Sequence, residues 1–347
     1  MTPRAPDESP LTFEKLQELI DSHYRFQLLN AAVKFDLFTL LRNPLSEEAI
    51  AKALGVAPQP VAILLEGCVA LGLIERREGL YRASSVAALA LAAESPFDQR
   101  PLVRFADEVT YPAARHLHEA LRDHRNAGVD CFPGEGETLY SRLPEHPDAA
   151  HAFDAMMRTV TGHVTGRLLR EIAFPDGGRL LDVAGGGCDL AIALAQRWPS
   201  LAVTVLDLPW VVTEAEVRLR AAGMDHCVRL IGGDAFAGAF PASDHIIFAH
   251  FLEIWSEARG RELLRVARRA LAPHGRIYLV NMVQPDAGDV GFGAVAASLY
   301  FQAIASGEGR VRRWCDYESW LEDAGFVPER RVALTPMHGL IVARSKA

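Results

Sequence analysis

The sequence predicts an α/β protein in which a doubly wound parallel sheet follows a largely helical N-terminal part. From about Gly178 onward, short β-rich runs alternate with helical segments, and this alternation is typical of a parallel sheet covered by helices. Between Leu11 and about Ala93, apolar residues instead recur every three or four positions, which is the helical period. We therefore expect three parts, over residues 11–95, 96–172 and 173–347.

The composition is that of a folded protein with a substantial core. Of the 347 residues, 50% are hydrophobic and 23% are charged, which disfavours disorder. The 36 basic and 44 acidic residues give a net charge of -8, whereas a general nucleic-acid binder is typically basic. We therefore expect no nucleic-acid partner.

The cysteines and the apolar runs predict a cytoplasmic protein. Five cysteines are scattered without any Cys-x-x-Cys pair, so we expect reduced thiols and neither a zinc knuckle nor a disulfide framework. The opening MTPRAPDESPLTFEKLQEL contains no apolar signal core. The longest apolar stretch, Val86–Ala93, is far shorter than the roughly 20 residues of a membrane span, so we expect no membrane association.

The N-terminal part predicts helices followed by a hairpin. FEKLQELIDSHYRFQLLNAAVKFDLFTLL carries the apolar spacing of a buried helix face. A helix capped by Ser46 is expected to end at Gly55, a second covers Pro58–Ile74, and ERREGLYRAS turns at Gly79. Helix, helix and hairpin in this order resemble a winged-helix unit.

Two functions are open for this unit. In a DNA-binding protein the second helix would carry basic residues for phosphates and base edges. Pro58–Ile74 contains no Lys or Arg and has Glu66 in its middle. The sequence therefore favours a packing or dimerisation module over a metabolite-sensing transcription factor, which remains the alternative from another class.

A glycine cluster follows the first β-rich run. The chain reads Leu180–Gly187, LLDVAGGG, before a helical run over Leu190–Arg197. Glycines between a strand and a helix let a ligand approach the backbone at the carboxyl edge of the sheet. The dinucleotide fingerprint needs a further glycine where Leu190 stands, and no Gly-Lys-Ser/Thr follows, so a nicotinamide dehydrogenase and a P-loop are both disfavoured.

Acidic residues follow the next strands. Asp207, in LDLP, is about 20 residues beyond the glycines, where a carboxylate can accept hydrogen bonds from ribose hydroxyls. In GGDAF, Asp234 and Phe236 could hold an adenine by a hydrogen bond and apolar contact. Each element alone could be an ordinary turn at a strand end, but the three in this order predict a site for an adenosine-containing ligand.

Together, DVAGGG, LDLP, GGDAF, HFLEIWSE and WLEDAGF make the chain resemble a known family from about Leu16 to Ala343. These are the S-adenosylmethionine-dependent small-molecule methyltransferases of the plant O-methyltransferase type, which carry a winged-helix-like dimerisation domain. The resemblance implies a homodimer formed through residues 11–95, a helical linker and substrate lid over 96–172, and a Rossmann-like methyltransferase domain over 173–347. It also implies S-adenosyl-L-methionine as the cofactor and a small-molecule methyl acceptor.

The resemblance assigns residues to each part of the cofactor. Asp182 and the three glycines would lie against the methionine moiety, Asp207 would hold the ribose, and Asp234 with Phe236 would flank the adenine. The full set of implied cofactor contacts is Asp182, Gly185, Gly186, Gly187, Asp207, Leu208, Asp234, Ala235 and Phe236.

The sequence departs from the family pattern at the position of the catalytic histidine. The family's Leu-His-Asp-Trp element reads Leu252–Trp255, Leu-Glu-Ile-Trp, so Glu253 takes the histidine's place and the nearest imidazole is His250. In addition, Ala184 and Cys188 stand where glycines are usual, and a valine replaces the glutamate before Arg312.

These departures leave the acceptor atom open. A general base accelerates transfer to a hydroxyl by about 10² to 10⁴, whereas a thioether sulfur or an activated carbon needs no prior proton removal. Glu253 or His250 could be the catalytic base, the base could lie elsewhere, or none is needed. We expect O-methyl transfer from the family, with S- or C-methyl transfer, or an enzyme that has lost methyl transfer, as alternatives. His250 and Glu253 without a third ligand predict no metal site.

Apolar residues near the acceptor are predicted from the same resemblance, and a basic cluster is read from the residues themselves. The expected substrate contacts are Phe153, Met156, Met157, Tyr300 and Phe301, for which the alternative is an ordinary core position. Three arginines, Arg310, Arg312 and Arg313, could bind a substrate carboxylate or form a solvated turn.

Overall fold

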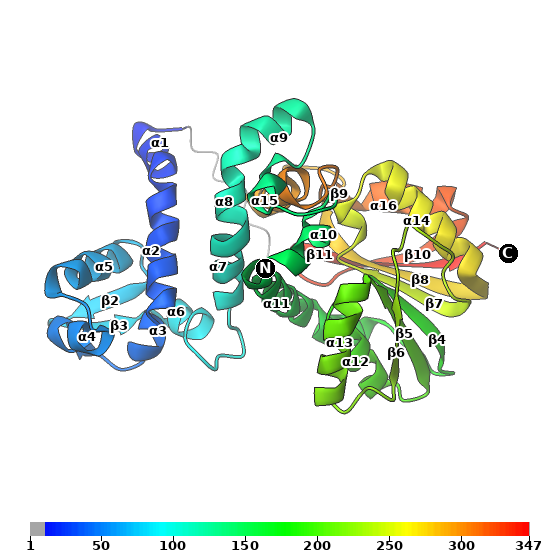
Figure 1. The fold of residues 1–347 in the computed structure, drawn as a ribbon, viewed down its shortest axis with the longest axis horizontal. Helices are drawn as coiled ribbons and strands as arrows, with labels where there is room; N and C mark the ends of the chain where they lie inside the picture. Colours follow the sequence, from blue (N-terminus) through cyan, green and yellow to red (C-terminus); the bar gives the residue numbers. More distant parts are fainter. Residues whose placement is uncertain (1–10, 347) are drawn as a thin grey trace. The chain divides into compact units, whose positions relative to one another are not determined.

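The computed structural model describes residues 11–346. By its internal contacts the chain divides between Val109 and Thr110 into an N-terminal and a C-terminal unit, which we describe separately (Figure 1). The division into 11–95, 96–172 and 173–347 stays a prediction.

The N-terminal unit is mostly helical with one small sheet, whose antiparallel strands lie in the order β1-β3-β2. Its strands are β1 (Leu45–Ser46), β2 (Ile74–Arg77) and β3 (Leu80–Ala83). Its helices are α1 (Phe13–Ile20), α2 (Ser22–Lys34), α3 (Leu37–Leu40), α4 (Glu47–Leu54), α5 (Pro58–Ala70), α6 (Ser85–Ala90) and α7 (Arg100–Phe105), after which a π-helical turn, η1 (Ala106–Thr110), leads onward.

Three of the predicted features of these elements are confirmed, but the helix expected over Pro58–Ile74 ends at Ala70, because Gly72 has a positive φ of 67° and Ile74 begins β2. The Ser46 hydroxyl accepts the N–H of Ala49 at 3.3 Å and caps α4. Helix α4 ends at Gly55, whose φ of 64° is the left-handed conformation that glycine adopts at low cost. The hairpin turns through Glu78 and Gly79, which both have positive φ, as a tight two-residue turn requires.

The expected buried helix face is not formed by the first segment within its own unit. The chain breaks into separate helices, and α1 buries none of its residues within the unit, with Phe13 92% exposed. The core of the unit forms instead from α3, α5 and the sheet, around Phe38, Leu65 and Tyr81. The apolar side chains of α1 therefore do not join the hydrophobic core formed by the described residues of their own unit.

The C-terminal unit begins with short helical segments and then forms the main sheet. Its helices are α8 (Tyr111–Ala113), α9 (Leu117–Asp123), α10 (Leu139–Arg142), α11 (Pro147–Glu171), α12 (Asp189–Arg197), α13 (Pro209–Ala221), α14 (Glu257–Ala270), α15 (Phe292–Tyr300) and α16 (Trp314–Asp323). Its 3₁₀ and π segments are η2 (Ala114–His116), η3 (Ala127–Cys131), η4 (Leu143–Glu145), η5 (Leu252–Ile254) and η6 (Phe301–Ala305). Its strands are β4 (Gly178–Val183), β5 (Leu201–Asp207), β6 (Val228–Gly232), β7 (Ser243–Ala249), β8 (Leu271–Gln284), β9 (Arg312–Arg313), β10 (Phe326–Ala333) and β11 (His338–Ser345).

The sheet is α/β and doubly wound as predicted, but it is mixed rather than parallel throughout. Its order is β10-β11-β8-β7-β4-β5-β6, with β9 beside β8. Strands β4 to β8 run parallel, whereas β10 and β11 form a hairpin that pairs antiparallel with β8. A hairpin must reverse direction, so the last strand cannot continue the parallel set. The strand order changes direction between β4 and β7, which places a ligand site at their carboxyl ends.

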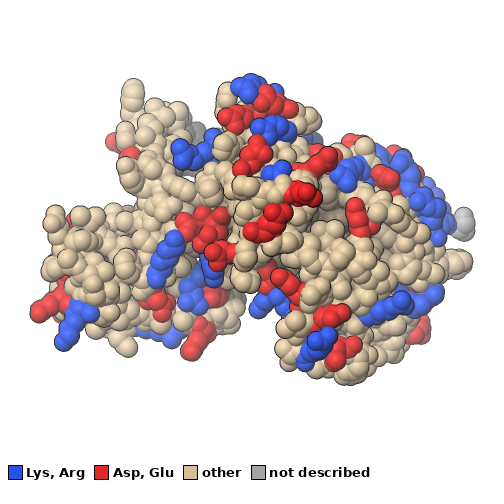
Figure 2. Space-filling view, viewed as in Figure 1, with Lys and Arg blue, Asp and Glu red and all other residues tan. Residues whose placement is uncertain are grey.

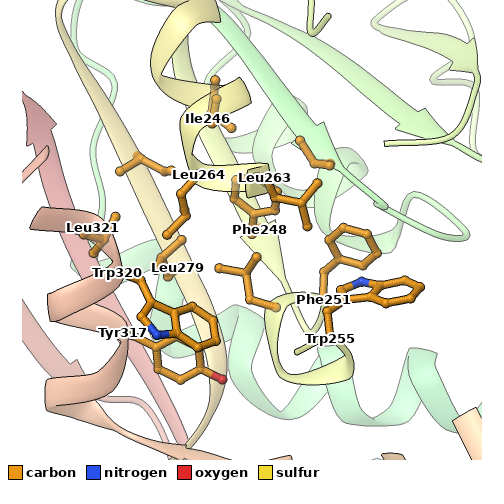
Figure 3. Close-up of a cluster of buried hydrophobic side chains, with 14 of the residues drawn as sticks. Ile246, Phe248, Phe251, Trp255, Leu263, Leu264, Leu279, Tyr317, Trp320 and Leu321 are labelled. Atoms are coloured by element: carbon orange, nitrogen blue, oxygen red, sulfur yellow. The ribbon is translucent and has the colours of Figure 1, made fainter. Parts of the chain in front are cut away.

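Successive residues of the central strands pack into two different hydrophobic cores, one on each face of the sheet, because side chains alternate between the faces along a strand. Phe248 and Leu279 pack with α14 and α16, as Figure 3 shows around Trp320. Their neighbours Ile247 and Tyr278 pack with α11, α12 and α13 on the other face. The sheet is therefore buried on both sides, and its carboxyl edge is where polar side chains can meet a ligand.

The distribution of charge on the surface and the length of the apolar helices concern two possible partners, nucleic acid and membrane. On the face drawn in Figure 2, basic and acidic side chains are interspersed over the C-terminal unit. Between residues 11 and 346 no single helix is long and apolar enough to cross a membrane, although α4 and α5, bent by 113°, pass that test as a pair by length and composition alone.

Candidate active site

The loop after β4 has a strained backbone. Ala184, Gly186 and Cys188 all have positive φ, at 58°, 55° and 67°. Glycine adopts this region freely, but a side chain there costs on the order of 1 kcal/mol or more. Ala184 and Cys188 stand where glycines are usual in the resembled family, and both have a backbone conformation that favours glycine. This chain therefore keeps that conformation without glycine at either position.

Asp182, at the end of β4, is completely buried beside this loop. Neither carboxylate oxygen has a hydrogen-bond partner within residues 11–346. A Cβ on Gly185 would lie 2.7 Å from Asp182 Oδ2, so only glycine fits there. Burial, reinforced by the charge of Asp207, raises the pKa of Asp182 to about 7. An unpaired buried carboxylate favours a ligand that brings positive charge or a hydrogen-bond donor.

Asp207, at the end of β5, ties the glycine loop to the next strand. Its Oδ2 accepts the N–H of Gly186 at 2.8 Å, and its Oδ1 accepts the N–H of Leu208 at 2.7 Å. Burial raises its pKa, although these two bonds favour the charged form. Each carboxylate oxygen keeps a second lone pair, so both can still accept a ligand hydroxyl.

The GGDAF segment follows β6. Asp234 is exposed, and its Oδ1 accepts the N–H of Phe236 at 2.9 Å, while Ala235 is buried. The Phe236 ring packs nearly perpendicular to Trp255, with centroids 4.8 Å apart. The Arg259 guanidinium lies 3.9 Å from the Phe236 ring centre and 4.2 Å from that of Trp255. The aromatic side of this site therefore includes Trp255 and Arg259, which we did not predict as contacts, although HFLEIWSE contained the signal for the tryptophan.

An ion-pair network holds the glycine loop from outside. Arg218, on α13, donates to Asp154 on α11 at 2.6 Å and to Asp189 at 3.2 Å. The same guanidinium donates to the backbone oxygen of Gly187 at 3.3 Å. It passes so close to Gly187 that a Cβ there would clash with it. The network links α11, α13 and the loop.

Glu253 lies in η5, just after β7, and its side chain is 2% exposed. Its Oε1 accepts the N–H of Met282 at 3.3 Å. In the orientation that satisfies both ends of its amide, Asn281 donates to Glu253 Oε2 at 2.5 Å. Burial raises the pKa of Glu253 to about 7, which is the range that suits a general base at neutral pH.

His250 is a weaker candidate for the base. Its Nδ1 is 3.9 Å from Glu253 Oε1, and its ring meets that of His338 nearly perpendicular, with centroids 5.1 Å apart. Burial, with the neighbouring His338, lowers the pKa of His250 to about 3. A neutral imidazole with so low a pKa holds an abstracted proton poorly, so the geometry favours Glu253 over His250.

The predicted acceptor residues are only partly brought together. Phe153, on α11, packs edge-on against Tyr140, with centroids 5.6 Å apart. The Tyr140 hydroxyl lies 3.5 Å from that of Tyr300, and Tyr300 packs against the buried Phe301. Tyr140 was missed because it follows a Pro/Gly-rich loop and lies 160 residues from Tyr300.

Two predicted acceptor residues, Met156 and Met157, lie one turn beyond Phe153 on α11 and are partly exposed. Both methionines thus follow Phe153 along the helix, and their contact with a substrate stays a prediction.

Two of the three arginines of the 310–313 segment, Arg312 and Arg313, have structural side-chain contacts, whereas Arg310 is exposed. Arg312 is buried, donates to the backbone oxygen of Trp255 at 2.7 Å, and lies 4.6 Å from the Trp320 ring centre. Arg313 donates to the backbone oxygen of Asp286 at 3.3 Å. These contacts favour a structural role over the binding of a substrate carboxylate.

We searched the described residues for side chains that could hold a metal ion together. No group of three or more His, Cys, Asp or Glu side chains in residues 11–346 is arranged to hold an ion.

Comparison with known proteins gives consistent results. The family described as "O-methyltransferase domain" matches residues 114–327, and that described as "O-methyltransferase dimerisation domain" matches residues 17–93. The L-tyrosine C(3)-methyltransferase of Streptomyces lavendulae is 33% identical over 97% of this chain and 94% of its own. The acetylserotonin O-methyltransferase of Bos taurus is 29% identical over 90% of this chain and 92% of its own.

Solved structures agree. The apo form of the S-adenosylmethionine-dependent methyltransferase SibL is 35% identical, with a TM-score of 0.80 over 97% of this chain and all of that one. Human N-acetylserotonin methyltransferase in complex with S-adenosylmethionine shares the fold, with a TM-score of 0.85, 23% identity and coverage of 99% of this chain and 100% of that one.

The chain belongs to the S-adenosylmethionine-dependent O-methyltransferase family, with its dimerisation domain. It is a methyltransferase of small metabolites. The residues at the sheet edge fit the cofactor: the orphaned carboxylate of Asp182 suits its positive charge, the glycine loop leaves room for it, and Asp207 offers acceptors for a diol.

We predict that cofactor affinity depends on the protonation of Asp182. Its charged form attracts a cation, and its pKa of about 7 means that it becomes neutral as the pH falls below 7. Affinity for S-adenosylmethionine should therefore fall by up to about tenfold per pH unit below neutrality. Calorimetric titrations between about pH 5.5 and 8 measure this. Asp182→Asn should bind weakly with a flat pH profile, and a flat profile in the unaltered protein would contradict the assignment.

We predict that Arg218→Ala loosens the glycine loop. Losing its bonds to Asp154 and Gly187 should weaken S-adenosylhomocysteine binding roughly tenfold, the size of one charge-assisted hydrogen bond. Isothermal calorimetry measures the affinity. The matched control is Arg220→Ala on the same helix, which removes only an exposed pair with Glu216 and should bind normally. Equal affinities for the two variants would mean that the network does not support the loop.

Proposed function

We propose that the enzyme transfers the methyl group to a ring carbon of a tyrosine-like phenol. The observation that carries this proposal is Glu253, a buried carboxylate in the place of the family's catalytic histidine. The relative at 33% identity is named for methylation of C(3) of L-tyrosine, and this name supports a phenolic acceptor. A phenol needs no other activation, because loss of the hydroxyl proton makes the ring carbon ortho to the oxygen nucleophilic.

The mechanism follows from the side chains at the sheet edge. When bound, S-adenosylmethionine supplies a methyl group on a positively charged sulfur, from which a nucleophile can take it. Glu253 takes the phenol proton, and its pKa of about 7 leaves it partly ionised at neutral pH. The ring carbon ortho to the hydroxyl takes the methyl group as the methyl–sulfur bond breaks, which leaves S-adenosylhomocysteine. That carbon then loses its hydrogen as a proton, which restores aromaticity, and the phenolate oxygen takes its proton back from Glu253. The product gains one methyl group, and one proton is released overall.

The residues around Glu253 supply position. The N–H of Met282 and the amide of Asn281 hold the carboxylate, while the aromatic cluster of Tyr140, Phe153 and Tyr300 offers an apolar surface to a phenol ring. Holding donor and acceptor in line, with water kept out, supplies much of the remaining rate acceleration.

O-methyl transfer is the second candidate. The family description and the acetylserotonin O-methyltransferases favour it. Glu253 would then remove the proton of the hydroxyl that itself takes the methyl group.

Product analysis distinguishes the two. Purified enzyme incubated with L-tyrosine and methyl-¹³C-labelled S-adenosylmethionine should yield a product whose label couples to ring carbons in NMR. Label on the phenol oxygen would favour the second candidate. No methylated product from L-tyrosine or other phenols would contradict the proposal.

We infer that the N-terminal unit is a winged-helix-like module that forms a homodimer. The order of α4, α5 and the β2–β3 hairpin supports the first part, and the match to a dimerisation domain supports the second. Helix α1 exposes Phe13, Leu19 and Ile20, and α2, α4 and α5 form an apolar groove between Leu28 and Ile63. A second copy is the partner that fits, because its own α1 carries exposed apolar side chains that can fill such a groove.

We also infer a cytoplasmic location. All five cysteines are free thiols, and Cys68 and Cys188 among them are buried. Reduced thiols persist in a reducing compartment, which supports the inference.

We predict that Glu253→Gln loses activity without losing the cofactor. Removal of the base should lower kcat/KM by about 10² to 10⁴. In the unaltered enzyme at saturating S-adenosylmethionine, kcat/KM for the phenol should fall about tenfold per pH unit below about pH 7, because Glu253 becomes protonated there. The variant should lack this acid limb and should bind S-adenosylhomocysteine normally by calorimetry. A variant within a few-fold of the unaltered rate would exclude Glu253 as the base.

We predict that a charge on α1 disrupts the dimer. Phe13→Asp places a carboxylate on the exposed apolar face and should shift the mass measured by light scattering toward the monomer at micromolar concentration. The control is Val217→Asp, an exposed apolar position on α13 that is 65% accessible, which should leave the mass unchanged. A dimer unaffected by Phe13→Asp would place the interface elsewhere.

A further inference from the structure

A segment that is distant in sequence, residues 306–312, holds the turn that carries Glu253. We call residues 253–256 the Glu253 turn. Three successive backbone oxygens of this turn each accept a hydrogen bond from the segment. The bonds run from the Arg310 N–H to the oxygen of Glu253 at 2.9 Å, from the Ser306 hydroxyl to that of Ile254, and from the Arg312 guanidinium to that of Trp255 at 2.7 Å.

The next residue of the turn, Ser256, is bonded to the same segment. Its N–H donates to Glu308 Oε2 at 3.3 Å, and the other carboxylate oxygen of Glu308 accepts from Arg259 at 3.1 Å. Arg259 is the residue whose guanidinium lies over the Phe236 ring. Glu308 thus connects the Glu253 turn with the aromatic side of the proposed cofactor site.

Gly309 lets the turn and the segment approach each other closely. A Cβ at this position would lie 2.6 Å from the backbone oxygen of Glu253 and closer still to that of Ile254. Both atoms belong to the backbone, so the turn or the segment would have to move to make room. The φ of Gly309 lies outside the left-handed region, so it is the close approach that requires glycine here, and the backbone conformation does not.

The 306–312 segment is itself anchored to the central sheet. It ends in β9, which pairs with β8, and the buried side chain of Gln284 on β8 donates to the backbone oxygen of Val311 at 3.0 Å. Strand β8 also supplies Met282 and Asn281, which hold the carboxylate of Glu253. The backbone and the carboxylate of Glu253 are therefore both positioned relative to one strand.

The same segment contacts the helix of a predicted acceptor residue. The Ser298 hydroxyl, on α15, accepts the N–H of Val311 at 3.0 Å and donates to the backbone oxygen of Ala294 at 2.7 Å. Tyr300, one of the predicted substrate contacts, follows on the same helix. The segment thus contacts both the turn of the proposed base and the helix of an expected acceptor residue.

We propose that the 306–312 segment is a positioning element that fixes the Glu253 turn so that the carboxylate reaches the phenol proton, with Gly309 and Arg312 as its main positioning residues. Both act through Glu253, because their contacts are with the backbone of the turn. A base must lie within about 2.6–3.2 Å of the atom that carries the proton. A displacement of about 1 Å can therefore lower the rate by about 10². This inference rests on the proposed role of Glu253 as the base.

The test is a double-mutant cycle of Gly309→Ala with Glu253→Gln in the full-length enzyme. The readout is the single-turnover rate with labelled S-adenosylmethionine and L-tyrosine, or the phenol that product analysis identifies. In the unaltered enzyme, Gly309→Ala should lower this rate roughly 10- to 100-fold. In the Glu253→Gln background no base remains to be positioned, so the same alanine should lower the rate by no more than about twofold. Calorimetry with S-adenosylhomocysteine verifies that each variant is folded.

Arg312→Lys is the second variant, and it decides if Gly309→Ala does not fold. It keeps the positive charge but cannot reproduce the two bonds that the guanidinium makes to backbone oxygens. It should lower the rate about tenfold, again only when Glu253 is present. The controls are Arg268→Lys, whose guanidinium also donates to two backbone oxygens, and Gly166→Ala, an exposed site on α11 with room for a Cβ. Both should keep the unaltered rate.

Equal losses in the two backgrounds would mean that the segment stabilises the fold without positioning the base. That result, or unaltered rates for both Gly309→Ala and Arg312→Lys, would overturn this inference and leave Glu253 as the base. An unaltered rate for Glu253→Gln alone, or an enzyme that methylates no phenol, would overturn it together with the proposed function.

Discussion

Two carboxyl groups, Asp182 and Glu253, are buried at one edge of the sheet, and the rest of the site is arranged around the cost of keeping them charged. Asp182 lies at the end of β4 and Glu253 follows β7. These are neighbouring parallel strands, so their carboxyl ends meet. Burial raises the pKa of each to about 7. Glu253 offsets part of that cost through its hydrogen bonds to Met282 and Asn281, but Asp182 has no such partner among the described residues. The first arrangement suits a base and the second a cation site.

Helix α11 contacts both of the sites proposed for the reaction. Phe153 packs against Tyr140 at the proposed acceptor site, and the next residue, Asp154, accepts a hydrogen bond from Arg218, which contacts the glycine loop of the proposed cofactor site. Adjacent residues of one rigid helix thus contact both sites. A shift of α11 would move both, which gives the fold a physical means of aligning methyl donor and acceptor.

Local patterns were sufficient for much of this organisation. The Ser46 cap, the end of α4 at Gly55 and the hairpin turn at Gly79 each depend on residues within a few positions of one another, so their chemistry is legible in the chain. The alternation of strands and helices beyond Gly178 followed from local patterns in the same way. The mixed sheet did not, because antiparallel pairing of β11 with β8 is a contact across more than fifty residues.

The sequence by itself determined which residue types stand at the carboxyl end of each strand: the glycines after β4, Asp207 at the end of β5 and Glu253 after β7. Only the tertiary structure decided their chemical state. Burial, which no local pattern encodes, makes Glu253 a better base than His250 and turns Arg312 inward. The tertiary structure also brings the hydroxyl of Tyr140 close to that of Tyr300, which lies 160 residues further along the chain. The physical reason is that pKa and contact depend on what surrounds a side chain in space, and those neighbours come from distant parts of the chain.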